Sequence, residues 1–196
     1  MVCYNHPLGS LQHYPDYIGL NGLWAAECFN YGSTCSGRAE TFEPIEDLLH
    51  EGKRIFPLVG DDSHVVSSVG KCFTMIQSSD LKYENVIQAL EKGNFYCSTG
   101  PELYSIAIEK GILHITCSEV IELSVTTERR VSFRKVSDSE YPFTEVTFDL
   151  NDYEQKSHLF EGHYENACFR VTVTDANGKV AYSRPYYLTE VFNNTI

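Results

Sequence analysis

A change in hydrophobic pattern near residue 100 limits what this chain of 196 residues can fold into. Before it, short apolar runs alternate with amphipathic stretches of helical period. After it the helical period disappears, and short runs that alternate in the strand-like period of two follow one another between turn residues. The sequence therefore predicts an α/β domain over residues 1–101, an all-β domain over 102–190 and a frayed tail at 191–196.

The first domain is expected to alternate strands with helices. The expected strands cover residues 1–4, 23–29, 54–59 and 73–77, and the expected helices cover 42–53 and 83–92. The first helix places Ile45, Leu48 and Leu49 on one face, and Gly52 can end it. Alternation of this kind implies mostly parallel pairing, in an α/β layer or barrel.

The second domain is expected to consist of seven short strands. They cover residues 103–108, 112–117, 121–126, 131–136, 144–150, 167–174 and 180–187. Turn sequences separate them, among them Lys110-Gly111 and the stretch from Asp175 to Gly178. Many short strands with turns between them predict an antiparallel β-sandwich.

Composition excludes some functions and indicates a compartment. The net charge of −12 argues against nucleic-acid binding, which needs clustered Lys and Arg. No stretch approaches the roughly 18 apolar residues of a membrane span. The seven cysteines are odd in number and form no CxxC pair, and the first residues lack the features of a signal peptide. We therefore expect free thiols in the cytoplasm.

Candidate metal ligands follow the third expected strand. Gly60 ends that strand, and Asp61, Asp62, Ser63 and His64 come directly after it. In an extended segment, residues two apart point to the same side, which favours Asp62 over Asp61 as the partner of His64. A carboxylate together with an imidazole suits Zn, Mn or Fe.

Two other strand ends carry polar residues that would meet this pair. His6 follows the first expected strand, and Glu27 and Asn30 lie at the end of the second. The carboxyl ends of parallel strands share one edge, where such folds place their sites. The sequence thus predicts one divalent metal ion held by His6, Asp62 and His64.

Each of these positions has an alternative interpretation. A His-Pro pair after a strand is also a common turn sequence, and a lone Asp-x-His occurs often by chance. Glu27 is either a hydrogen-bonding neighbour of the ligands or an exposed side chain. Asp61 competes with Asp62 for the carboxylate role. Only Arg38 and Lys71 lie where they could contact a phosphate.

Four segments together resemble the C-terminal part of the PHP (polymerase and histidinol phosphatase) family of metal-dependent hydrolases. They are Asn5-His6-Pro7, Glu27-Cys-Phe-Asn30, Asp61-Asp-Ser-His64 and the stretch from Leu90 to Pro101, which contains Gly-Asn-Phe-Tyr-Cys-Ser-Thr-Gly-Pro. The order and spacing of these segments carry the resemblance. It covers roughly residues 2–101 and does not extend into the second half.

The resemblance implies a partial, distorted β/α barrel of the PHP type, followed by the β-sandwich. It also implies metal-assisted hydrolysis of a small-molecule phosphoester. His6 matches the family's His-Pro ligand, and Asp62 with His64 matches its closing Asp-x-His pair. Glu27 matches a strand-end position to which no role is assigned.

The chain departs from this family at its start, where the family carries an H-x-H motif and further ligands. No H-x-H occurs in the sequence. The expectation is therefore a truncated hydrolase, weak or inactive as this chain, with a polypeptide that completes the barrel or with self-association. The alternative is a non-catalytic accessory protein whose β-sandwich binds a carbohydrate, a peptide or a partner subunit.

Overall fold

The computed structural model describes residues 1–38, 41–129, 132–150 and 166–192. The chain divides into two compact units, Met1–Thr99 and Gly100–Ile196. The predicted boundary, after residue 101, lies close to this division. None of the helices in the described residues is long and apolar enough to cross a membrane.

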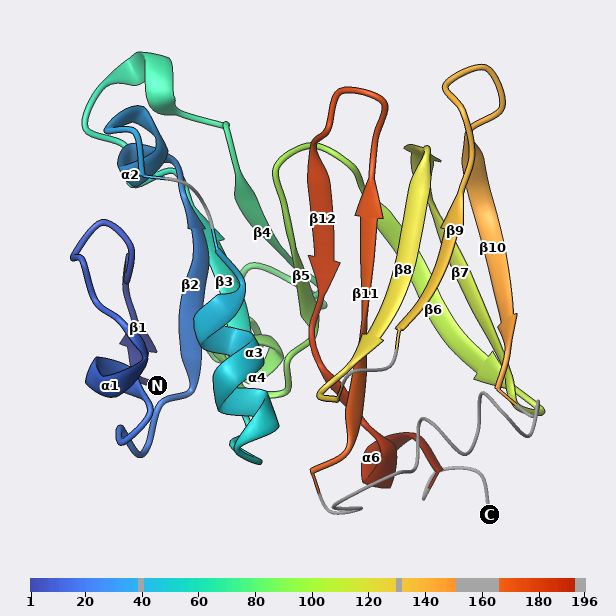
Figure 1. Ribbon diagram of the computed structural model, residues 1–196, viewed down its shortest axis with the longest axis horizontal. Helices are drawn as coiled ribbons and strands as arrows, with labels where there is room; N and C mark the ends of the chain where they lie inside the picture. Colours follow the sequence, from blue (N-terminus) through green and yellow to red (C-terminus); the bar gives the residue numbers. More distant parts are fainter. Residues whose placement is uncertain (39–40, 130–131, 151–165, 193–196) are drawn as a thin grey trace. The chain divides into compact units, whose positions relative to one another are not determined.

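The first unit begins with a parallel sheet of three strands in the order β1-β2-β3 (Figure 1). The strands are β1 (Cys3–Tyr4), β2 (Ala25–Asn30) and β3 (Phe56–Gly60), and the helices between them are α1 (Tyr14–Tyr17), α2 (Tyr31–Cys35) and α3 (Glu43–His50). Helix α3 packs against β2 and buries Ile45, Leu48 and Leu49, the face that its sequence predicts. Ala25 and Ala26 of β2 are fully buried and leave room for that contact.

The remainder of the first unit is an antiparallel pair. Strand β4 (Phe73–Ile76) pairs with β5 (Phe95–Ser98), and they are linked by helix α4 (Tyr83–Glu91). A loop that contains the single-turn 3-10 helix η1 (Val66–Ser68) joins β3 to β4. Strand β5 was not expected from the sequence, and its antiparallel direction ends the parallel arrangement after β3.

The second unit is built of antiparallel strands. One sheet has the order β10-β7-β6, from β6 (Leu103–Glu109), β7 (Ile112–Val120) and β10 (Phe143–Asp149). The other strands pair in the order β12-β11-β8-β9, and β13 also pairs with β11. Their bounds are β8 (Glu122–Thr127), β9 (Ser132–Val136), β11 (Cys168–Thr174), β12 (Val180–Ser183) and β13 (Tyr186–Tyr187). A short helix, α6 (Leu188–Phe192), follows β13.

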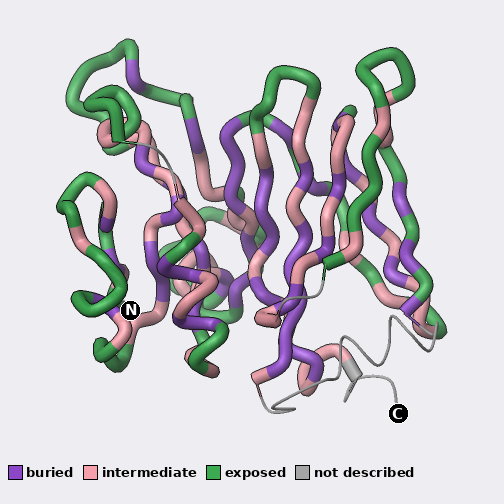
Figure 2. The backbone as a smooth tube through the Cα atoms, viewed as in Figure 1, coloured by how far each residue is buried: buried purple, intermediate pink, exposed green. Residues whose placement is uncertain are grey.

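Alternate residues of these strands form the core of the second unit. The completely buried side chains include Leu113 and Ile115 of β7, Leu123 and Val125 of β8, and Val171 of β11. Figure 2 shows the buried positions along the strands and the exposed turns at their ends. In β7 and β8 the alternation that predicts the strand is thus the alternation between core and more exposed positions, whereas the first four residues of β11 are all buried.

The predicted fold class, a partial β/α barrel followed by a β-sandwich, is wrong. Strands dominate the described residues, and none of the three sheets closes into a barrel. A barrel would need further parallel strands after β3, whereas the next two strands pair antiparallel to each other. Of the tail predicted at 191–196, the first two residues belong to α6, and 193–196 lie outside the described residues.

Candidate functional site

Polar residues gather where the three parallel strands end. Because β1, β2 and β3 run in the same direction, their carboxyl ends lie at one edge of the sheet. Asn30, the last residue of β2, pairs with Gly60, the last residue of β3. Asp62 and His64 follow Gly60, and His6 follows β1. The parallel pairing therefore delivers the predicted residues to neighbouring positions.

Asn30 connects two carboxylates at this edge. Its side chain is buried, and its Oδ1 accepts a hydrogen bond from the backbone N–H of Ser33 at 2.8 Å, which caps α2. That bond fixes the orientation of the amide, because only the oxygen can accept. Its Nδ2 then faces Glu27 and Asp62, with 3.3 Å to an oxygen of each carboxylate.

His6 contacts the Glu27 carboxylate through its backbone. Its N–H donates to Glu27 Oε2 at 2.6 Å, while its ring Nδ1 lies 2.8 Å from the hydroxyl of Ser10. The backbone φ is +33° at His6 and +46° at Asp62. Residues other than glycine rarely adopt positive φ values. Strained backbone of this kind is concentrated at functional sites.

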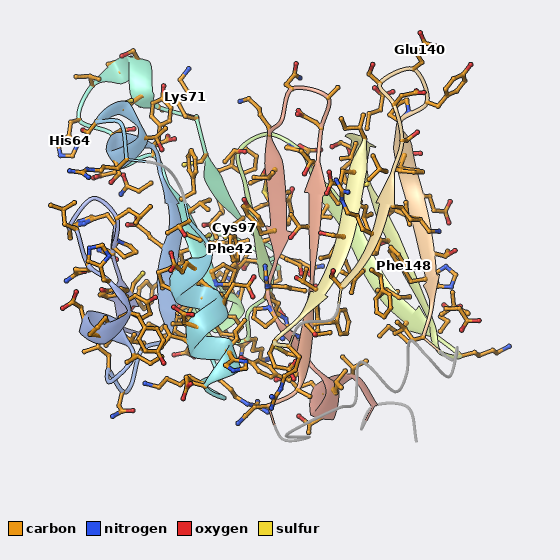
Figure 3. All side chains as sticks on the ribbon, viewed as in Figure 1. Phe42, His64, Lys71, Cys97, Glu140 and Phe148 are labelled. Atoms are coloured by element: carbon orange, nitrogen blue, oxygen red, sulfur yellow. The ribbon has the colours of Figure 1, made fainter. Side chains whose placement is uncertain are left out.

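The ring of His64 is held in one tautomer. Its Nδ1 lies 2.7 Å from the backbone oxygen of Asp62, and since a carbonyl can only accept, Nδ1 carries the proton. The lone pair is then on Nε2. The same arrangement, an N–H donated to a carbonyl with the other nitrogen free, is how proteins orient histidines that bind metals. His64 is exposed on the loop between β3 and β4 (Figure 3).

The two adjacent aspartates have different roles. The carboxylate of Asp61 accepts hydrogen bonds from the backbone N–H groups of Gly70, Lys71 and Cys72, so it closes the loop after β3. The carboxylate of Asp62 instead faces Asn30, and its Oδ1 lies 3.9 Å from Nδ1 of His64. Only Asp62 is therefore directed to the strand edge.

Two carboxylates, those of Glu27 and Asp62, give this edge negative charge. Within the described part of the chain, neither Glu27 nor Asp62 forms an ion pair with a lysine or arginine. A small cavity of about 20 Å³ lies beside Glu27; its lining includes His6, Asn30 and Ser33 but neither Asp62 nor His64. A space of this size holds one water molecule or one ion.

The structure does not bring the three predicted metal ligands, His6, Asp62 and His64, around one position. Among the described residues, no group of three or more His, Cys, Asp or Glu side chains is placed to hold a metal ion. Asp62 and His64 lie together, whereas the ring of His6 is directed to Ser10. The bridging role of Asn30 was not predicted. The close approach of α2 was not predicted either: a Cβ on Gly32 would lie 3.1 Å from Asp62 Oδ2.

The variant Asn30→Asp tests the negative charge at this edge. It keeps an acceptor for Ser33 but replaces the bridging amide by a third carboxylate. We expect it to lower the free energy of unfolding by about 1 kcal/mol in EDTA. Added MnCl₂ should stabilise the variant more than the native protein, as urea denaturation would measure. Equal stability of the two proteins in EDTA would contradict the described cluster.

Comparison of the sequence with models of protein families, with curated proteins and with solved structures finds no match.

Proposed function

We propose that this chain is a divalent-metal-dependent hydrolase of phosphoesters, with its metal at the strand edge that carries His6, Asp62 and His64. One observation supports this most: Asn30 holds the carboxylates of Glu27 and Asp62 together, and neither forms an ion pair with a lysine or arginine of the described residues. Grouped carboxylates are costly without a cation, so a bound ion would relieve their repulsion.

The donor set fits such an ion. Asp62 offers a carboxylate and His64 offers Nε2 in a fixed tautomer, both after β3, and His6 follows β1, two strands away in the same sheet. Carboxylate and imidazole ligands suit Zn, Mn or Fe. When bound, such a cation makes a water molecule acidic enough to attack a phosphoester near neutral pH. We expect weak affinity and slow turnover, because His6 must turn from Ser10 to join the other ligands.

Two cations near this edge are suited to contact a phosphate. The side chains of Arg38, after α2, and Lys71, on the loop after β3, are exposed and make no hydrogen bond or ion pair with the described residues. Lys71 lies on the same loop as His64 (Figure 3). The resemblance of the four segments between Asn5 and Pro101 to the PHP family is consistent with this assignment.

Metal binding by single-site variants tests the proposal. Loss of either proposed ligand in His64→Ala or Asp62→Asn should weaken Mn²⁺ or Zn²⁺ binding at least about tenfold, measured by equilibrium dialysis with elemental analysis. The matched control is His114→Ala, which removes a histidine from β7 in the second unit and should leave the affinity unchanged.

A second measurement separates binding from catalysis. Hydrolysis of bis(p-nitrophenyl) phosphate should require Mn²⁺ or Zn²⁺ and should fall in the same two variants. Metal affinity that is the same in His64→Ala, Asp62→Asn and the native protein would reject the site. Metal binding without any hydrolysis would retain the site and reject the enzyme.

A further inference from the structure

The second unit contains a groove of about 770 Å³ that plays no part in the proposed hydrolase. It lies between β6, β7, the β9–β10 connection and the β11–β12 turn; the last two are at the same end of this unit (Figure 1). The side chains and backbone around it are Tyr104, Cys117, Ser118, Glu119, Ile121, Ser139, Pro142, Thr144, Asp175, Ala176 and Asn177. The volume is in the range of sites for small ligands.

Two irregularities of one sheet form the floor of this groove. On one side of β7, Leu103 pairs with Cys117 and Ser105 with Thr116, so Tyr104 is an additional residue of β6. On the other side the pairing passes from Phe143–Val120 to Glu145–Thr116, which leaves residues 117–119 of β7 opposite Thr144 alone. Bulges bend strands and redirect side chains, and they are frequent beside binding sites.

The walls of the groove are held in place by local hydrogen bonds. Asp175 Oδ1 accepts from the backbone N–H groups of Asn177 at 2.8 Å and Lys179 at 2.9 Å. Asp138 closes the β9–β10 connection in the same way, with its Oδ1 3.0 Å from the N–H of Glu140. A site whose walls are already ordered loses little entropy when a ligand binds.

The lining combines an exposed ring with uncharged polar groups and one available carboxylate. Tyr104 is 62% exposed, so much of its side chain is accessible to a ligand. The side chain of Glu119 is exposed and makes no hydrogen bond or ion pair with the part of the chain that the structure describes. Ser139 and Thr144 add hydroxyls, and Asn177 adds an amide. No lysine, arginine or histidine of the described residues lines the groove, which argues against an anionic ligand.

We propose that this groove binds a short, neutral oligosaccharide. A sugar ring presents an apolar C–H face that packs on an aromatic ring, and here Tyr104 supplies that ring. The hydroxyl groups of the sugar can donate charge-assisted hydrogen bonds to the Glu119 carboxylate. They can also form hydrogen bonds with the hydroxyls of Ser139 and Thr144 and the amide of Asn177. The ligand carries no negative charge, because the groove has carboxylates and, among the described residues, no cation.

Titration with defined sugars tests this assignment. Maltotriose, cellotriose and chitotriose are added to the full chain, and binding is followed by calorimetry. At least one should bind with a millimolar or tighter Kd, and Tyr104→Ala should weaken it about tenfold, as expected for loss of a stacking ring. Glu119→Gln should weaken it by a similar factor through loss of the charged acceptor.

The matched controls lie outside the groove. Tyr83→Ala removes a tyrosine of the first unit that is 74% exposed, and Glu145→Gln removes an exposed carboxylate from β10; neither should change the affinity. Circular dichroism of all four variants establishes that they are folded.

Failure of all three sugars to bind, or binding that Tyr104→Ala and Glu119→Gln leave unchanged, overturns the proposal. A lysine-rich peptide that binds in place of the sugars, and is lost in those two variants, also overturns it. Because the metal ligands are elsewhere, none of these outcomes bears on the hydrolase.

Discussion

Replacement of Phe95 by alanine is expected to destabilise the first unit by about 3–4 kcal/mol. Phe95 of β5 is only 6% exposed and completes a triangle of aromatic rings with Trp24 and Phe56. The ring centroids are 5.8 Å apart for Trp24 and Phe56, 6.0 Å for Trp24 and Phe95, and 5.6 Å for Phe56 and Phe95. Such tilted arrangements add to the effect of burial alone.

The triangle connects segments that are distant in the sequence. Trp24 directly precedes β2, Phe56 begins β3 and Phe95 begins β5, so these rings join the parallel sheet to the antiparallel pair. Removal of one ring leaves a cavity that its two neighbours line, and the surrounding strands cannot fully close it.

The chain's only tryptophan reports this effect directly. Trp24 fluorescence during urea denaturation should show the loss of stability in Phe95→Ala. Phe95→Leu, which fills much of the space, should cost about 1–1.5 kcal/mol. Tyr83→Ala, at an exposed position, should be within about 0.5 kcal/mol of the native protein. An unfolding midpoint of Phe95→Ala equal to that of the native protein would show that the triangle contributes little.

The sequence predicts the individual elements better than their arrangement. The amphipathic pattern around Ile45, Leu48 and Leu49 identifies α3, because one face of that helix is buried and the other is not. Strand β5 was missed because its four residues, beside Gly93 and Gly100, carry no extended alternation. Its antiparallel direction depends on pairing with β4, a contact that no local pattern encodes, and this contact makes the barrel prediction wrong.

The candidate site shows the same division. Spacing alone favoured Asp62 over Asp61, and the structure separates them by their hydrogen bonds. The part that Asn30 takes in joining two carboxylates depends on where α2 begins, and that short helix was not predicted. The turn of His6 toward Ser10 is likewise a local contact that strand ends do not specify. The metal site therefore stays a prediction that binding measurements must test.

Asp61 is the residue of the β3–β4 loop whose loss should cost most. Its carboxylate lies 2.8 Å from the N–H groups of both Lys71 and Cys72 and also accepts from Gly70, so one side chain joins the two ends of the loop. Asp61→Ala would leave these donors to water and release the segment that carries His64. With allowance for solvent screening, we expect a loss of about 2 kcal/mol in the free energy of unfolding.

The effect of Asp61→Ala should depend on pH in one direction. Partial burial raises the pKa of Asp61, but the hydrogen bonds from Cys72, Gly70 and Lys71 outweigh it and hold the pKa below its ordinary value. The stabilisation is therefore complete above the ordinary aspartate pKa of about 4 and is lost as the pH falls through the lower value of the folded protein. On acidification from about pH 6 toward pH 3, the difference between the native protein and Asp61→Ala should stay constant down to about pH 4 and then shrink.

Thermal unfolding at a series of pH values, with Asp61→Asn as the matched variant, measures this dependence. The asparagine keeps an oxygen acceptor but no charge, so the difference between Asp61→Asn and Asp61→Ala should not change with pH, whereas the difference between the native protein and either variant should. Each comparison cancels the titration of the other carboxylates, because the three proteins share them. A native-to-alanine difference that stays constant over this range would mean that the charge of Asp61 does not hold the loop. In that case the position of His64 would have to depend on other contacts of residues 61–72.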